Sequence, residues 1–243
     1  MVDAMKIVCI IPARYNSSRF PGKPLADING KPMIWWVHTQ AKKVHELDEV
    51  YVATDDDRIA KVVEGFGGKS IMTSDKHATG TDRLTEAAEQ IFADWYVNIQ
   101  GDEPFIEPDS IRAVLPVSVC SEEAQVVTLM SRITNPTDLF NPNVVKAITS
   151  ERGRGVYLTR SAAPFPRNAS DAVYYKHYGV YSFSHSALEF FRNAPRGRLE
   201  RIEDAELLRF IESGYYVKFV EIKSASVAVD TENDLKELLS VQT

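Results

Sequence analysis

Apolar and polar residues alternate in a regular way over the first hundred positions of the chain. Short runs rich in Val and Ile have the length of strands buried on both faces, and amphipathic stretches with a helical period separate them. The strand-like runs lie at residues 6–11, 49–54, 69–73 and 95–100. The helix-like stretches lie at residues 33–44, 57–66 and 81–92. This alternation predicts an α/β fold with a mostly parallel, doubly wound sheet.

Signals at the ends of the helix-like stretches agree with this prediction. Pro32 suits the first position of the helix that starts there, and the aspartates at 55–57 can cap the next helix. Gly67 and Gly68 stop that helix, because glycine readily adopts the conformation that ends a helix. Ligands of such folds bind beyond the carboxyl ends of the strands, so the loops after the first and last of these strands are the places to search.

The second half of the chain is less regular. Strand-like runs lie at residues 125–131, 143–150, 155–160, 174–184, 215–222 and 226–231. Helix-like stretches lie near residues 185–194, 199–213 and 232–240. We expect antiparallel pairing to begin here, and no repeat or linker divides the chain. The interpretation is a single domain over residues 1–243 that contains a small lobe, around residues 130–195, which packs on a partner subunit.

Composition excludes several classes of protein. The chain has 243 residues, 28 basic and 34 acidic, with a formal net charge of -6, whereas a general nucleic-acid binder has a basic excess. Its two cysteines form no metal or disulfide motif, which fits a reducing cytoplasm. No apolar run approaches the roughly 18 residues that a membrane span needs. We therefore expect a cytoplasmic protein without a membrane span.

Three basic residues crowd the loop after the first strand-like run, in the stretch IPARYNSSRFPGKPL. Arg14, Arg19 and Lys23, with the hydroxyl of Ser17, can hold a polyphosphate. The GxxxxGK[ST] and GxGxxG motifs are both absent, and Asn16 stands where a phosphate loop often has glycine. The alternative is that each arginine makes only a surface ion pair. The strand–loop–helix context favours the phosphate site.

Two carboxylates follow strand-like runs. Asp102, after Gly101 in NIQGDEPFI, can hold Mg²⁺ together with substrate phosphates. Asp230, in SVAVDTEND, can supply a second oxygen ligand, as in many phosphoryl-transfer sites. Each has a plainer alternative: Asp102 could only start a loop, and Asp230 could only cap the helix that follows.

Two further segments carry polar groups that could meet a ligand. HATGTDRL places Arg83 at a strand-to-helix junction, where it could close on a base and a sugar; the alternative is a Thr81 helix cap with a solvated Arg83. YYKHYGVYSF puts His177 and Tyr181 on one face of a strand, which indicates the wall of a polar pocket rather than a core histidine.

The motifs PARYNSSRFPGKPL, GTDR, NIQGDEP, NPNVVK, YYKHYGVY, GRLERIED and VDTENDL, in this order, resemble the CMP-Kdo synthetases, the 3-deoxy-manno-octulosonate cytidylyltransferases. The resemblance spans about residues 6–239. It implies a nucleotide-diphospho-sugar transferase-like fold, a small dimerisation and sugar-binding lobe, and a homodimer. It also implies that CTP and a 3-deoxy-2-keto sugar acid react, with Mg²⁺, to give the CMP-sugar and diphosphate for surface-glycan synthesis.

The resemblance also implies a role for each matching residue. By this resemblance, the CTP phosphates are bound by Arg14, Ser17, Arg19 and Lys23. The nucleotide and the sugar lie near Arg83 and Gln100. The resemblance implies that Mg²⁺ is bound by Asp102 and Asp230. It implies that the sugar is bound by Arg160, His177, Tyr181 and Glu206, and that Arg160 contacts the sugar carboxylate. Catalysis would depend on Arg14, Lys23, Asp102 and Asp230.

Departures from the family pattern bear on the sugar. Leu207 stands where the family has glutamine, and Ala228 and Glu232 stand where Gly and Pro are common. A lost amide hydrogen bond at Leu207 points to a Kdo variant such as the 8-amino-8-deoxy analogue, or to another ulosonic acid such as a sialic acid. The remaining alternatives are a catalytically silent nucleotide-sensing module and a glycosyltransferase. The presence of Lys23, Asp102 and Asp230 counts against the first, and the second would more often carry its acidic pair as a DxD and would have less use for the basic first loop.

Overall fold

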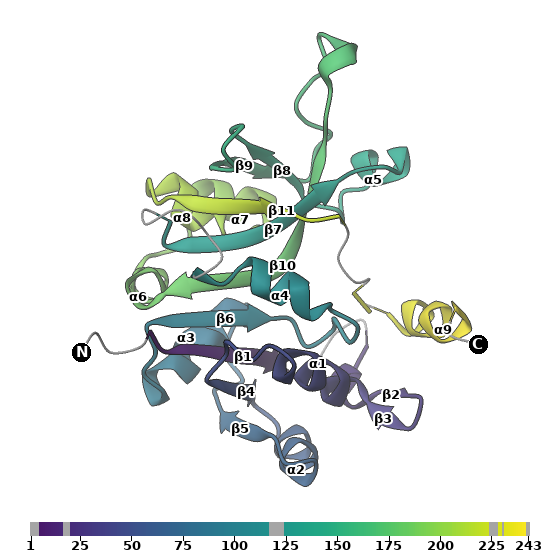
Figure 1. The fold of residues 1–243 in the computed structure, drawn as a ribbon, viewed down its shortest axis with the longest axis vertical. Coiled ribbons are helices and arrows are strands. Elements are labelled where there is room, and N and C mark those ends of the chain that lie inside the picture. The colour runs from purple at the N-terminus through teal and green to yellow at the C-terminus, as the bar shows by residue number, and fades with distance from the viewer. Residues whose placement is uncertain (1–4, 17–19, 117–123, 224–227, 230, 242–243) are drawn as a thin grey trace. The chain divides into compact units, whose positions relative to one another are not determined.

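The computed structural model describes residues 5–16, 20–116, 124–223, 228–229 and 231–241. The chain forms two compact units (Figure 1). Unit 1 comprises residues 1–112 and 226–243, and unit 2 comprises residues 113–225. The lobe predicted around residues 130–195 falls inside unit 2.

Unit 1 contains the parallel strands that the hydrophobic pattern predicts. They are β1 (Ile7–Ala13), β4 (Glu49–Thr54), β5 (Lys69–Met72) and β6 (Trp95–Ile99). Their order is β6-β1-β4-β5, and every neighbouring pair is parallel. All seven residues of β1 are buried, because the strand lies between two neighbours inside the sheet and both of its faces are covered. The predicted α/β class is confirmed.

Three helices of unit 1 begin close to where the sequence places them. They are α1 (Met33–Lys42), α2 (Asp57–Gly65) and α3 (Gly80–Gln90). A further helix, α4 (Pro108–Ala113), was not predicted; it leads into unit 2. The Asp56 carboxylate caps α2 by accepting from the Arg58 N–H. Pro32 is the residue before α1 rather than its first residue, because it closes a hairpin of β2 (Asp27–Ile28) and β3 (Lys31–Pro32) that the sequence pattern missed.

The last helix, α9 (Glu232–Val241), belongs to unit 1. Its leucines join a small core with residues from the first loop, the β2–β3 hairpin and α1. The buried members are Phe20, Ile28, Met33 and Val229, and Leu235, Leu238 and Leu239 pack against them. Half of the strand-like run at 226–231 lies outside the described residues, and its described members are not in a strand. The chain thus returns to unit 1 immediately before Asp230.

Unit 2 holds a mixed sheet, as expected for the second half of the chain. Its strands are β7 (Val126–Arg132), β8 (Lys146–Thr149), β9 (Gly155–Thr159), β10 (Tyr175–Ser184) and β11 (Val217–Glu221). Within the unit β11, β7, β10, β8 and β9 are successive neighbours, and only the β11–β7 pair is parallel. The β7–β10 register shifts between Tyr178 and Tyr181, so β10 carries a bulge.

Helices of unit 2 differ from the prediction at two places, the unpredicted α5 (Pro136–Phe140) and the stretch at 199–213. The other helices are α6 (His185–Asn193), α7 (Arg198–Glu203) and α8 (Leu208–Glu212). The single helix expected over residues 199–213 is wrong: Asp204 has φ 48° and ψ 52°, a left-handed conformation that ends α7. Glu206, which is predicted to contact the sugar, therefore lies in a turn between two helices.

Candidate functional site

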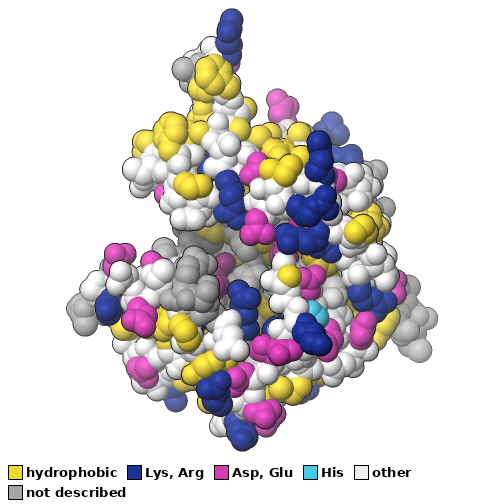
Figure 2. All heavy atoms as spheres, turned by 180° about the vertical axis from the view of Figure 1, so that it is seen from behind, with side chains coloured by type: hydrophobic (Ala, Val, Ile, Leu, Met, Phe, Trp, Pro, Cys, Tyr) yellow, Lys and Arg dark blue, Asp and Glu magenta, His cyan; other side chains and the backbone are white. Residues whose placement is uncertain are grey.

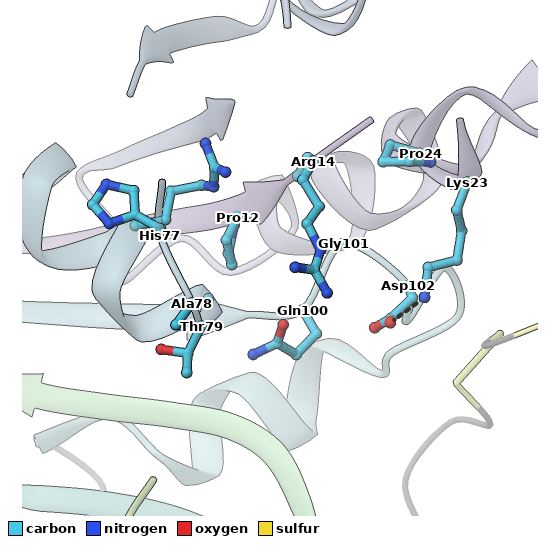
Figure 3. Close-up of a pocket in the computed structure, with 13 residues that line it drawn as sticks. Pro12, Arg14, Lys23, Pro24, His77, Ala78, Thr79, Gln100, Gly101 and Asp102 are labelled. Carbon is cyan, nitrogen blue, oxygen red and sulfur yellow. Dashed lines mark hydrogen bonds and ion pairs between the residues drawn. The ribbon is translucent and has the colours of Figure 1, made fainter. Parts of the chain in front are cut away.

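A pocket of about 170 Å³ opens in unit 1 at the carboxyl ends of β1 and β6 (Figure 3). Its walls are Pro12, Ala13, Arg14, Lys23, Pro24, His77, Ala78, Thr79, Gly80, Arg83, Gln100, Gly101 and Asp102. The figure shows the side chains of Arg14 and Gln100 pointing toward one another, with the Lys23–Asp102 pair beside them. The pocket thus brings together five of the predicted residues: Arg14, Lys23, Arg83, Gln100 and Asp102.

Adjacent parallel strands explain why these residues meet. Because β1 and β6 run parallel side by side, the loops that leave their carboxyl ends emerge at the same edge of the sheet. Gly101 allows the close approach: a Cβ at this position would lie 2.9 Å from the Pro12 carbonyl oxygen. The group that comes close to this glycine is the main chain at the end of β1.

Lys23 and Asp102 form an ion pair within the pocket. The Lys23 Nζ donates to Asp102 Oδ2 over 2.6 Å, and the two side chains are 13% and 23% exposed. Lys23 follows Gly22, whose φ of 73° requires the left-handed conformation that glycine adopts at little cost. The pair places an ammonium and a carboxylate in contact at the same point of the pocket wall.

Contacts of Tyr15 hold the start of the basic loop in place. The Gly22 N–H donates to the Tyr15 carbonyl over 2.8 Å. The Arg58 guanidinium stacks on the Tyr15 ring at 3.3 Å from its centroid and also pairs with Asp56 at 2.7 Å. Arg14, next to this anchor, is exposed and lines the pocket. Ser17 and Arg19, the other predicted phosphate ligands, lie outside the described residues.

Arg83 is a buried member of the pocket wall. Its guanidinium donates to Thr73 Oγ1 over 2.5 Å and lies 3.4 Å from Asp55 Oδ2. The alternative of a solvated Arg83 is therefore wrong, since its side chain is only 4% exposed. Thr79, not Thr81, caps α3, through a capping box with Asp82. The amino end of α3 lines the pocket with Thr79 and Gly80, so its N–H groups add positive potential there.

His77 is a pocket residue that sequence reasoning missed. Its Nε2 bonds the Glu86 carboxylate, which also accepts from the Ser74 N–H over 2.8 Å. Burial opposes ionisation of Glu86, but these two hydrogen bonds and the nearby charges hold the pKa of Glu86 below its ordinary value. The sequence contains a signal for this pair: His77 begins the stretch HATGTDRL, and Glu86 lies in the helix that follows.

Asp102 has the chemistry of a magnesium ligand. Among the described residues no three His, Cys, Asp or Glu side chains are grouped as a ready-made metal site. Mg²⁺ does not need one, because it usually binds one or two carboxylates together with phosphates and waters. Asp102 is the acid of the pocket wall, and its carbonyl accepts from the Val229 N–H over 2.9 Å. Asp230, which follows Val229 in the chain, lies outside the described residues. The donor set therefore fits a divalent ion that arrives with phosphates.

In unit 2, Arg160 holds a turn together. Its guanidinium donates to the carbonyls of Glu203 at 2.7 Å, Pro142 at 2.9 Å and Asp204 at 3.2 Å. An arginine has five N–H donors, and these bonds to described residues use three of them. Its own carbonyl accepts from Lys146 Nζ over 2.6 Å. Burial lowers the pKa of the Lys146 ammonium, and the Arg160 charge lowers it further. The carboxylates of Glu203 and Asp138 partly offset this by raising the pKa.

The other predicted sugar residues also lie in unit 2. The rings of His177 and Tyr181 stack with centroids 5.6 Å apart, so the two residues share a face of β10, as predicted. Burial lowers the pKa of His177 to about 3. Glu206 is partly buried in the turn between α7 and α8, and Leu207 beside it is only 1% exposed. The apolar residue at position 207 is thus part of a packed interior.

Surface charge agrees with the composition. Figure 2 shows Lys and Arg side chains interspersed with Asp and Glu over one face of the molecule. Among the described helices, none combines the length and apolar character that crossing a lipid bilayer requires.

Comparison with known proteins gives the family. The cytidylyltransferase model matches residues 8–223. The chain is similar to the 8-amino-3,8-dideoxy-manno-octulosonate cytidylyltransferase of Shewanella baltica, at 44% identity over 96% of this chain and 97% of that protein. It is similar to the 3-deoxy-manno-octulosonate cytidylyltransferase of Geobacter sulfurreducens, at 44% identity over 97% and 98%. A solved structure of CMP:2-keto-3-deoxy-manno-octonic acid synthetase complexed with CTP matches with a TM-score of 0.93, at 40% identity and 98% coverage of both chains. The chain belongs to the cytidylyltransferase family.

Proposed function

We propose that this protein is a nucleotidyltransferase that joins CTP to a 3-deoxy-2-keto sugar acid, giving the CMP-sugar and diphosphate. The observation that carries the proposal is the pocket of unit 1, where Arg14, Lys23 and Asp102 meet at the carboxyl ends of two parallel strands. The sugar class is Kdo or its 8-amino analogue, because relatives named for each match at 44% identity.

The CTP triphosphate would be held by the cations of the pocket. Arg14 and Lys23 bring positive charge to it, the amino end of α3 adds main-chain donors, and Ser17 and Arg19 are proposed to complete the cradle. Phosphate oxygens would attract Lys23 away from Asp102, because both anions compete for the same ammonium. Arg83 and Gln100 are proposed to contact the nucleotide, with Gln100 also reaching the sugar.

The reaction follows from these charges. The anomeric hydroxyl of the sugar attacks the α-phosphorus of CTP in line, the bond to the β-phosphate oxygen breaks, and diphosphate leaves. Arg14 and Lys23 stabilise the negative charge that develops on the phosphate oxygens. We propose that Asp102 and Asp230 hold Mg²⁺, which supplies further neutralisation of phosphate charge. No protein general base is assigned to the hydroxyl.

Residues of unit 2 are proposed to recognise the sugar acid. Arg160, His177, Tyr181 and Glu206 match the sugar positions of the family. Arg160 has N–H donors beyond the three that bond main-chain carbonyls of described residues, and these donors suit a carboxylate. The buried Leu207 offers no hydrogen bond to a sugar hydroxyl.

We further propose a homodimer that forms through unit 2, in the cytoplasm, where CTP is made. Unit 2 exposes large apolar side chains at Phe140, Val156, Phe165, Val173 and Ile202. Phe165 is 84% exposed and lies on the segment that projects from unit 2 between β9 and β10 (Figure 1). Such exposed apolar side chains support a proposed interface on this unit.

Diphosphate release tests the function. The protein is incubated with CTP, Mg²⁺ and, in turn, Kdo, its 8-amino analogue and a sialic acid. We expect release with Kdo or the 8-amino analogue and none without the sugar acid. Release with the sialic acid alone would show that the substrate is a sialic acid rather than Kdo or its 8-amino analogue. No release with any acid, nucleotide or divalent ion would refute the proposed nucleotidyltransferase activity and would favour a catalytically silent nucleotide-binding module.

A further inference from the structure

One buried hydroxyl in unit 2 lies at the bulge of β10. Thr128, on β7, is fully buried, and its Oγ1 has three neighbours within hydrogen-bond distance. They are the Val180 carbonyl at 2.9 Å, the Tyr178 carbonyl at 3.3 Å and His177 Nε2 at 3.0 Å. The bulge is what turns both carbonyls of β10 toward a single side chain.

Counting protons assigns the direction of each bond. A threonine hydroxyl has one proton to donate, and a carbonyl oxygen can only accept. If that proton pointed to His177, Oγ1 and the Val180 oxygen would face each other at 2.9 Å without a proton between them, which is repulsive. The hydroxyl therefore donates to a carbonyl of β10, and His177 Nε2–H donates to Oγ1.

We propose that Thr128 is a positioning residue that holds His177 as the neutral Nε2–H tautomer and presents Nδ1 as a hydrogen-bond acceptor to the sugar acid. The proposal rests on the proposed function, in which His177 contacts the sugar. A neutral acceptor selects a donor, which is a hydroxyl or amine of the sugar, and it repels the lone pairs of the carboxylate. His177 would therefore read the hydroxylated part of the substrate.

The surroundings of His177 fit this role. Within the described residues, Nδ1 makes no hydrogen bond. The ring is held by the Tyr181 stack on one side and by the edge contact with Phe219, with centroids 5.8 Å apart, on another. Burial lowers the pKa of His177 to about 3, so the ring is neutral at the pH of the cytoplasm. The main chain is fixed as well, since the His177 N–H donates to the Val145 carbonyl over 2.9 Å.

The tautomer is read directly by NMR of the full-length protein with ¹⁵N-labelled histidine. We expect, at neutral pH, a protonated-type ¹⁵N shift at Nε2 of His177, an unprotonated-type shift at Nδ1, and an Nε2 proton that exchanges slowly with water. A proton on Nδ1, or a doubly protonated ring, would overturn the proposal. This measurement needs no substitution, so it stands even if a variant fails to fold.

Kinetics then test the role toward the sugar. Thr128→Val keeps the shape and removes the acceptor, so we expect the KM for the sugar acid to rise about three- to tenfold, the range of one neutral hydrogen bond. We expect kcat and the KM for CTP to change less than about twofold, and the slow exchange of the Nε2 proton to be lost. Thr128→Ser restores the oxygen and should restore both readouts.

A matched control lies on the same strand. Ser131→Ala removes another buried hydroxyl of β7, which bonds Tyr178 Oη over 2.8 Å, and leaves the Thr128–His177 bond intact. If Ser131→Ala raises the sugar KM as much as Thr128→Val, or if Thr128→Val leaves that KM unchanged, the positioning role is contradicted. A wild-type protein without turnover would refute the proposed function instead, and the NMR result would still decide the tautomer.

Discussion

The Lys23–Asp102 contact concentrates the proposed chemistry in two side chains. With the pair at 2.6 Å, the charges of the ammonium and the carboxylate compensate each other. We expect Lys23→Met to reduce kcat by at least about 100-fold, because a cation aimed at developing phosphate charge is removed. The melting temperature should change little, since partly exposed ion pairs contribute only about 0–1 kcal/mol. Steady-state diphosphate release and thermal unfolding measure the two effects.

A matched substitution separates the site from the charge. Lys69 pairs with Glu49 at 2.7 Å, outside the pocket, so Lys69→Met removes another, more exposed, lysine–carboxylate pair without touching the site. Its kcat should stay within about twofold of wild type. A Lys23→Met enzyme that retains near-normal kcat would show that Lys23 has no role in catalysis.

His177 also makes stability depend on pH. Burial holds its pKa at about 3 in the folded protein, below the ordinary value of 6.5, so the unfolded chain binds a proton in that range that the folded chain does not. The free energy of unfolding should therefore fall as the pH drops from about 6.5 toward about 3, and the contribution is fully present above that range. The free energy of unfolding, measured in urea at several pH values, should depend less steeply on pH for His177→Asn than for the wild-type protein. If the two proteins lose stability equally between these pH values, the neutral His177 ring is contradicted.

The break between α7 and α8 depends on contacts that no local pattern contains. The Glu203 carboxylate accepts from Thr159 Oγ1 at 2.7 Å and from the Arg160 N–H at 2.8 Å, and Arg160 bonds the carbonyls around Asp204. Burial opposes ionisation of Glu203, but these hydrogen bonds hold the pKa of Glu203 below its ordinary value. An unbroken helix would lose these bonds to β9, which is why the chain adopts a left-handed residue there.

Arg160→Met tests the structural part of this arrangement. Three main-chain carbonyls would lose a charged donor, so we expect the free energy of unfolding to fall by about 1–3 kcal/mol in urea. Arg154→Met, at an exposed position beside the start of β9, should change it by less than about 0.5 kcal/mol. A stable Arg160→Met protein with an impaired sugar KM would instead make Arg160 a binding residue only.

Comparing sequence with structure at the level of elements shows where prediction succeeds. The buried strands β1, β4 and β6 were predictable because both faces are covered and their composition records it. The β2–β3 hairpin, with two residues in each strand, is too short to leave a periodic pattern. The pocket edge was predictable from strand order, whereas the pairing of Lys23 with Asp102, 79 positions apart, depends on tertiary structure alone.

At the scale of the whole molecule, the apolar side chains of unit 2 predict its association. We expect Phe165→Asp to weaken the homodimer at least about tenfold, because it places a charge in an apolar contact. Phe92→Asp, at a position of unit 1 that is 65% exposed, is the control and should leave the dimer intact. Sedimentation velocity over a range of concentrations measures both. A wild-type protein that sediments as a monomer throughout would rule the dimer out.

The central claim is the transfer of a cytidylyl group to a sugar acid, and ³¹P NMR of the reaction follows it directly. With CTP, Mg²⁺ and Kdo or its 8-amino analogue, the account predicts that the triphosphate signals disappear while one phosphodiester signal and one equivalent of diphosphate appear, and that Asp102→Asn slows this conversion by orders of magnitude. Unchanged CTP signals with every ulosonic acid and divalent ion, or a phosphate product other than diphosphate, would contradict it.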